Sequence, residues 1–292
     1  MPIPKGCRWG VDSWSPITKS LFDFAKTKTG DTPDFWGRYI GRAGSHLESS
    51  EIKFLQDNYP TTRLLIAYNP VSLSLSAVED KPRSNPSKEY DRGVADAGLA
   101  IASANGLVPA GVWIYANVEP THGKVSADWV QGWWDGMRAS PYGYGGIYGN
   151  TSSTQHTGYL GEAYGAAMAK MPDTFRPPLW AALPGRTKKT PAEINFEYEP
   201  GEPPGYKGAS VVWQYAVNWY PFDPKDPRSP GRFDTNLAVM RGYDGMWKVG
   251  SGAAAQPSGR ERPVEQSEAE SHLASSTASS AESAESREYS PR

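Results

Sequence analysis

Residues 113–120 read WIYANVEP, a short apolar run that ends in Asn117, Val118 and Glu119 before a proline. A buried parallel strand is a nearly continuous apolar run, and its first polar residues mark the place where the chain leaves the core. In α/β folds, ligands bind at that end of the strands. Taken alone, Glu119 fits a solvated loop residue or a salt-bridge partner, so the other strands must decide its role.

Similar apolar runs recur along the chain and alternate with segments of helical character. The strand-like runs are RWGVD (8–12), FWGRYIG (35–41), RLLIAY (63–68), AGVWIYA (110–116), YGGIY (144–148), PPLWAAL (177–183) and ASVVWQY (209–215). The segments with apolar residues at three- and four-residue spacing are 47–59, 87–106, 126–140 and 157–170. Repeated βα units predict a parallel sheet, and about 250 residues is the usual size of a (β/α)8 barrel.

We therefore predict an α/β fold, a (β/α)8 TIM-type barrel, with an open doubly wound sheet as the alternative. One sector is expected to be irregular, because the stretch 194–208 holds prolines and glycines that favour a loop over a short strand. Near residue 249 the composition changes to Ser, Ala and Glu with almost no large apolar residue. The predicted organisation is a barrel over residues 6–248 and a disordered acidic tail over 249–292.

The overall composition excludes several classes of protein. A net charge of -2 gives no general electrostatic reason to expect nucleic acid or an acidic membrane as partner. A single cysteine allows neither an internal disulfide nor a cysteine-based zinc site, and the four histidines form no H-E-x-x-H pair, so we expect no metal or other cofactor. No run approaches about 18 apolar residues, which predicts a soluble chain without membrane insertion or a classical export signal.

Polar residues end nearly every predicted strand. If the sheet closes, these side chains converge on the carboxyl rim of one barrel. They are Asp12, Arg42, Asn69, Glu119, Asn150 and Gln214, with Asp234 shortly beyond the last predicted strand.

Several of these motifs resemble those of a known family. GVDSW (10–14), an N-x-E at 117–119 in place of D-x-E, VVWQYA (211–216) and FDTN (233–236) are similar to motifs of the glycoside hydrolase family 25 lysozymes. More closely, residues 6–247 resemble the glycoside-hydrolase-like domain of unknown function 1906 of actinobacteria and their phages. FWGRYIGR, LIAYNP, YGGIYGN and PPLWAALP follow one another in the order that this domain would place its strands.

The resemblance implies a barrel that acts on the glycan of peptidoglycan, or derives from enzymes that do. It maps the acid that protonates the glycosidic oxygen onto Glu119, and two further acidic residues onto Asp12 and Asp234. Asn117 departs from the lysozymes, which have a carboxylate there. With N-acetylated sugars, the acetamide of the substrate can itself serve as nucleophile, and the protein then needs only to orient it.

Two functions remain open at this point. The first is a lysozyme-like glycoside hydrolase for peptidoglycan-type N-acetylated glycan, with Glu119 as acid and Asp12, Asp234 and Asn117 positioning the sugar. The alternative is a non-catalytic barrel that binds cell-wall glycan. Either protein would reach the wall by a partner membrane pore, as a phage lysin does, or by a non-classical exporter.

Aromatic and amide side chains near the strand ends complete the predicted site. Pyranose rings commonly stack on tryptophan, although core packing is the usual fate of this residue. Alternation along a strand also turns some tyrosines outward against the helices. Tryptophans 129, 133 and 134 lie at helical spacing, and we assign them to the core. The predicted substrate-binding residues are Trp14, Asn69, Asn150, Trp213, Gln214 and Tyr215.

Overall fold

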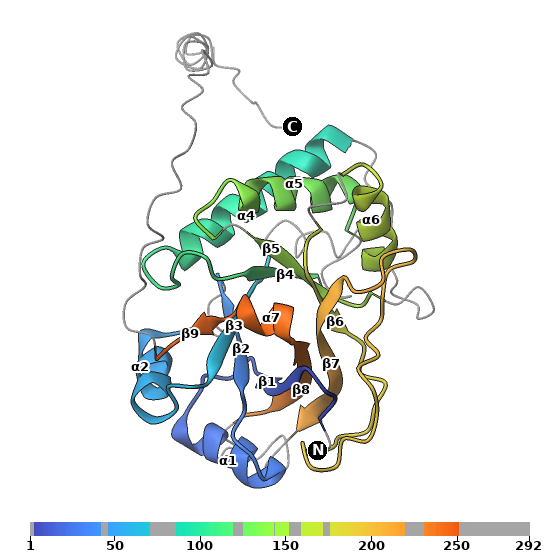
Figure 1. The fold of residues 1–292 in the computed structure, drawn as a ribbon. Coiled ribbons are helices and arrows are strands. Elements are labelled where there is room, and N and C mark those ends of the chain that lie inside the picture. The colour runs from blue at the N-terminus through green and yellow to red at the C-terminus, as the bar shows by residue number, and fades with distance from the viewer. Residues whose placement is uncertain are drawn as a thin grey trace, which may run out of the picture. The chain divides into compact units, whose positions relative to one another are not determined.

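Eight strands of the computed structural model close into a barrel, which confirms the predicted fold class (Figure 1). The order around the ring is β2-β1-β8-β7-β6-β5-β4-β3, and pairing of β3 with β2 closes it. The strands are β1 (Cys7–Asp12), β2 (Phe35–Ile40), β3 (Arg63–Tyr68), β4 (Ile114–Val118), β5 (Gly145–Gly149), β6 (Leu179–Ala182), β7 (Ser210–Trp219) and β8 (Phe233–Val239). A two-residue strand, β9 (Trp247–Lys248), pairs with the start of β3.

The structure describes residues 3–41, 46–70, 86–118, 125–142, 144–151, 159–171, 176–219 and 231–250. These residues fall within one compact unit, Met1–Ala254. The predicted disordered tail, 249–292, lies outside the described residues from residue 251 onward, whereas its first residue, Val249, is buried in the core of the barrel unit.

Strand direction departs from a regular (β/α)8 barrel at β8. Strands β1 to β7 run parallel to one another, whereas β8 is antiparallel to both β1 and β7. The start of β8 therefore lies beside the carboxyl end of β1, and Asp234 pairs directly with Asp12. Asp234, predicted to lie beyond the last strand, lies within an eighth strand that apolar periodicity did not reveal.

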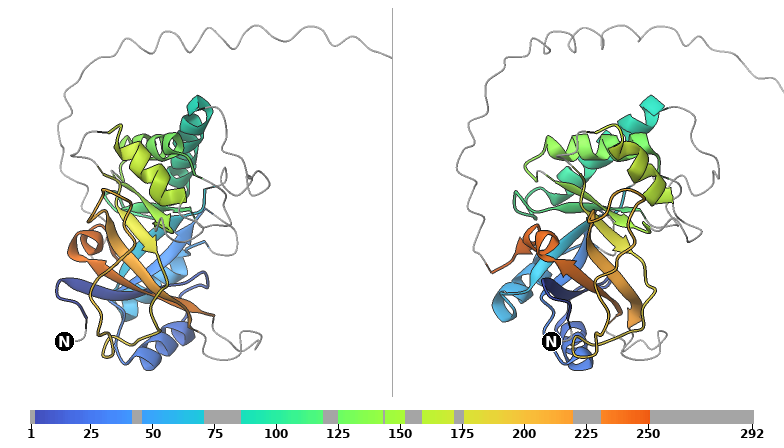
Figure 2. Two further views of the ribbon diagram at one scale, coloured as in Figure 1. Left: turned by 90° about the vertical axis from the view of Figure 1, so that its right-hand side faces the viewer. Right: turned by 45° about the vertical axis from the view of Figure 1, so that its right-hand side comes forward.

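Helices surround the barrel except along one sector. They are α1 (Lys19–Thr29), α2 (Ser49–Asn58), α4 (Pro86–Ala104), α5 (Ala127–Arg138), α6 (Tyr159–Met168) and α7 (Met240–Asp244). Helices α4, α5 and α6 gather on one side, away from α1 and α2 (Figures 1 and 2). All four predicted helical segments contain a helix, and α1 and α7 are additional.

The irregular sector is the stretch before β7. Residues 194–208 form no helix or strand, as predicted, and they cover the outer face of β7 in place of a helix. Phe196 and Tyr198 meet the ring of Trp213 edge-on, with centroid distances of 5.7 and 6.0 Å. An aromatic layer thus replaces helix packing here.

Alternation along the strands separates an inner from an outer layer of the core. On β2, Tyr39 belongs to the cluster inside the barrel, together with Tyr148 and Trp180, whereas Trp36 packs outward under the helices. The helix α5 places Trp129 in the outer core, fully buried as predicted. None of the helices in the described residues is both long and apolar enough to cross a bilayer.

Candidate functional site

Asp12 lies at the carboxyl end of β1, inside the barrel, and its side chain is only 1% exposed. Three neutral donors among the described residues hold its carboxylate. Tyr39 donates its hydroxyl to Oδ1 at 3.3 Å, and Oδ2 accepts from Asn236 Nδ2 at 2.7 Å and from Gln214 Nε2 at 3.1 Å. Hydrogen bonds to a charged acceptor are about twice as strong as neutral ones, so this carboxylate is fixed in one orientation.

Gln214 joins the two aspartates predicted for the site. Its Nε2 donates to Asp12 and also, at 3.2 Å, to Asp234 Oδ2, while its Oε1 accepts the Tyr148 hydroxyl at 3.2 Å. The other oxygen of Asp234 accepts the backbone N–H of Asn218 at 2.5 Å. Directly opposed residues of an antiparallel pair have Cβ atoms about 4.5–5.5 Å apart, so the amide of Gln214 bridges two neighbouring carboxyl groups.

A second polar group, the amide pair of Asn69 and Asn117, lies at the ends of β3 and β4. Asn117 is fully buried and Asn69 is 5% exposed, and Asn117 Nδ2 donates to Asn69 Oδ1 at 2.9 Å. Asn117 Oδ1 and Asn69 Nδ2 find no hydrogen-bond partner in the described part of the chain. If the oxygen and nitrogen assignments of both side-chain amides are swapped, one donor and one acceptor still have no hydrogen-bond partner among the described residues, and we call these two atoms open.

Tyr115 is another inward-facing polar residue of β4. It precedes Asn117 by two residues on β4, so both side chains point inward. Its hydroxyl is buried and, among the residues described, has no hydrogen-bond partner. Burial raises the pKa of Tyr115, so the hydroxyl stays protonated and available as a donor.

Trp14 lies just past the end of β1 and is partly exposed. Its ring stacks on Tyr39, with centroids 4.5 Å apart and planes 15° from parallel. Tyr39 therefore contacts both residues: its ring stacks on the indole of Trp14, and its hydroxyl donates to the carboxylate of Asp12.

The prediction that Trp213 and Tyr215 bind substrate does not fit their placement. Both flank Gln214 on β7, and because Gln214 faces inward they face outward, where they are 1% and 0% exposed. Trp213 donates its indole N–H to the Leu183 carbonyl, and the Tyr215 hydroxyl accepts from Trp9 Nε1. Their role is to pack β7 against the irregular sector.

Two predicted residues fall outside the described residues. Glu119 follows directly after Val118, the last residue of β4, and Arg42 follows Gly41. Asn150, the residue after β5, is described and partly buried.

Three inward residues that the sequence analysis did not select contribute to the site. Tyr39 and Asn236 hold Asp12, and Trp180 donates its indole N–H to Asn236 Oδ1 at 2.9 Å. The signal that could have found Asn236 is alternation, since it lies two residues after Asp234 on β8.

The two polar groups provide distinct chemistry at one end of the barrel. Fixed carboxylates stabilise positive charge that develops nearby, as it does on a sugar ring during glycosidic cleavage. An open donor beside an open acceptor matches the C=O and N–H of a secondary amide. Within the described residues, His, Cys, Asp and Glu nowhere gather in groups of three or more that could hold a metal ion.

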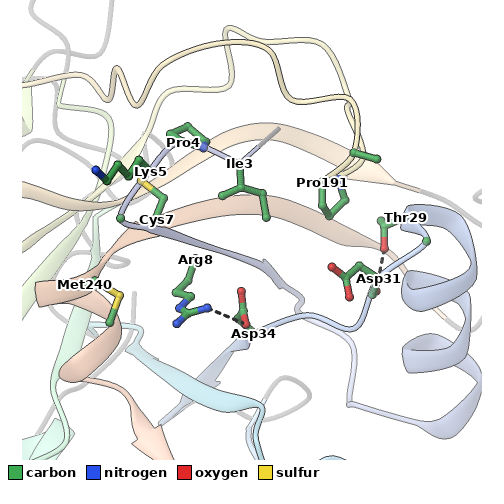
Figure 3. Close-up of a pocket in the computed structure, with 13 residues that line it drawn as sticks. Ile3, Pro4, Lys5, Cys7, Arg8, Thr29, Asp31, Asp34, Pro191 and Met240 are labelled. Carbon is green, nitrogen blue, oxygen red and sulfur yellow. Dashed lines mark hydrogen bonds and ion pairs between the residues drawn. The ribbon is translucent and has the colours of Figure 1, made fainter. Parts of the chain in front are cut away.

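A cavity of about 850 Å³ lies at the opposite end of the barrel. It is lined by Cys7 and Arg8 at the start of β1, Asp34 before β2, and Met240 at the start of α7 (Figure 3). Arg8 and Asp34 face one another there with N and O atoms 4.0 Å apart. The cavity contains none of the predicted site residues.

The structure is an α/β barrel with two bridged carboxyl groups at one end, Asp12 at the end of β1 and Asp234 at the start of β8, an arrangement suited to glycoside-hydrolase chemistry. The chain belongs to the family described as Rv2525c-like, glycoside hydrolase-like domain, whose model matches residues 34–219. This confirms the relation suggested by the sequence motifs.

Several solved structures are similar to this chain. A crystal structure of an uncharacterized protein from B. stearothermophilus is 25% identical, with a TM-score of 0.64 over 82% of this chain and 100% of that one. The spore cortex lytic enzyme SleM of Clostridium perfringens is 14% identical, with a TM-score of 0.44 over 80% and 68% of the two chains. The autolysin LytC of Streptococcus pneumoniae is 14% identical, with a TM-score of 0.45 over 79% and 46%. No curated protein matches the chain.

Proposed function

We propose that this glycoside-hydrolase-like domain cleaves the N-acetylated glycan of peptidoglycan. The observation that carries the proposal is the presence, at one end of the barrel, of two bridged carboxyl groups and an open amide pair. Cleavage needs an acid for the leaving oxygen and a second group that supports the developing oxocarbenium ion. Asp12 and Asp234 supply the negative charge, and Glu119 is the proposed acid.

The open amide pair supports the choice of an N-acetylated sugar. A buried polar atom without a partner costs about 1–3 kcal/mol, and a ligand that satisfies it recovers that cost. The acetamido group carries one carbonyl and one N–H, which match the open donor and acceptor of Asn69 and Asn117. A sugar with a free hydroxyl at that position would satisfy this pair less well.

The proposal is tested by release of reducing sugar from purified peptidoglycan. Glu119→Gln keeps the shape of the side chain and removes its proton, so we expect turnover to fall at least about a hundredfold while wall binding persists. Glu162→Gln, the same change at an exposed position of α6, serves as the matched control and should leave turnover unchanged. Intact peptidoglycan after incubation with the wild type from acid to neutral pH would contradict the hydrolase.

One observation favours a second function, a barrel that binds wall glycan without cutting it. Asn117 is a neutral, fully buried amide where the related lysozymes have a carboxylate. A binding module predicts that wild type and Glu119→Gln both sediment with the insoluble wall and neither releases sugar. The variant Asn117→Asp restores the carboxylate at this position. If it releases sugar and the wild type does not, the absence of that negative charge explains why the wild type binds glycan without cutting it.

A further inference from the structure

Arg38 and Glu51 form a buried ion pair on the outer side of β2. Their side chains are 0% and 3% exposed. Arg38 Nε donates to Glu51 Oε2 at 2.7 Å and Nη2 donates to Oε1 at 3.0 Å, which gives the planar, two-point contact that only arginine provides.

The pair also holds the segment 13–17, which joins β1 to α1. Arg38 Nη1 donates to the carbonyls of Ser13, at 2.8 Å, and Trp14, at 3.2 Å. Glu51 Oε2 accepts the backbone N–H of Ile17 at 2.6 Å. Two of the four Arg38 hydrogen bonds therefore go to this segment, and both of its ends are fixed by one ion pair.

Two residues of this segment, Ser13 and Trp14, connect it to residues around the two aspartates of the rim. Trp14 stacks on Tyr39, which holds Asp12. Ser13 Oγ donates to the carbonyl of Arg232, two residues before Asp234. Tyr39 is also the residue after Arg38 on β2, so one strand supports the indole from its inner face and holds its backbone from its outer face.

We propose that the Arg38–Glu51 pair positions Trp14 as the aromatic platform on which a sugar ring stacks. Arg38 does not touch the sugar; it acts through the backbone of the segment. This inference rests on the proposed glycan function for the identity of the ligand. A buried ion pair is weak support for stability, because desolvation offsets the attraction, so its value here lies in the geometry that it imposes.

The first test is a double-mutant cycle on wall affinity. Arg38→Lys keeps the charge opposite Glu51 but cannot hold two carbonyls and a carboxylate together. We expect it to weaken binding to purified peptidoglycan about five- to tenfold, the scale of one aromatic contact. In a Trp14→Ala background the same substitution should have no further effect, since residues that act as one unit are not additive. An equal loss in both backgrounds would overturn the proposal.

The matched control is Arg92→Lys, which makes the same change in the Arg92–Glu89 ion pair of α4. It should leave wall affinity unchanged. If Arg38→Lys does not fold, the variant Arg38→Met/Glu51→Met removes both charges together, which is often tolerated where loss of one partner is not.

The second test needs no ligand. In the wild type the Ile17 amide is buried and bonded to Glu51, so we expect its hydrogen exchange to be slow. We expect exchange at least about tenfold faster in Arg38→Lys, because the segment opens locally. Unchanged exchange would overturn the positioning role. If the wild type binds no glycan but exchange accelerates, the proposed function fails while the positioning of the segment stands.

Discussion

The two halves of the carboxyl rim use similar polar side chains in different ways. On the β1–β7–β8 half, both oxygens of Asp12 are occupied and Gln214 bridges to Asp234. On the β3–β4 half, Asn69 and Asn117 share one hydrogen bond and leave two buried atoms open in the described structure. The first half is held by hydrogen bonds among its own side chains, whereas the second leaves the hydrogen-bonding capacity of two buried atoms unused within the described residues.

Asp12→Ala should have the largest effect on the free energy of unfolding. The substitution leaves Asn236 Nδ2 and the Tyr39 hydroxyl without their acceptor inside the barrel, and we expect a loss of about 3 kcal/mol in urea unfolding. Asp244→Ala removes an exposed carboxylate paired with Arg63 and should cost less than about 0.5 kcal/mol. Equal losses for the two variants would show that the first half of the rim is not a supporting network.

Asn69→Leu/Asn117→Leu should leave the free energy of unfolding nearly unchanged. Replacing both partners by apolar groups of similar shape removes the open polar atoms together, so we expect a change within about 1 kcal/mol. Affinity for the cell wall should nevertheless fall at least about tenfold, because the two side-chain amides proposed to bind the acetamido group are absent. The single variant Asn117→Leu leaves the buried amide of Asn69 without its hydrogen-bond partner, so this variant should be less stable than the double one. A double variant as unstable as Asp12→Ala would remove the distinction between the two halves.

The sequence predicted the barrel because its buried parallel strands are apolar runs that end in polar residues. It did not reveal β8, since FDTNLAV has three polar residues among its first four and is no continuous apolar run, and strand direction depends on pairing with distant β1 and β7. Alternation alone could have predicted that Trp213 and Tyr215 face away from Gln214. The contact between Asn69 and Asn117 could not be predicted in this way, because it depends on the register of two strands separated by a long connection.

The smallest effect on the rim should come from modifying Cys7, the only cysteine. Five residue steps of about 3.3 Å place it about 16 Å from Asp12, at the other end of β1. Burial, and secondarily the charge of Glu197, raises the pKa of the Cys7 thiol to about 11 from 9.0. The reactive thiolate is therefore scarce below that pH, and alkylation at pH 8 should be about a hundredfold slower than for an unburied thiol and accelerate as pH rises.

Mass spectrometry after iodoacetamide treatment measures this rate, and wall binding by the alkylated protein should equal that of the untreated chain. Cys7 lines the cavity of Figure 3, where Arg8, Asp34 and Met240 also lie. If alkylation of Cys7 abolished wall binding, the cavity would influence glycan binding at the rim. The difference between the two halves of the rim would then not be enough to explain how the wall glycan is bound. If binding persists, the two rim halves act independently of the opposite end of the barrel, as their local hydrogen bonds imply.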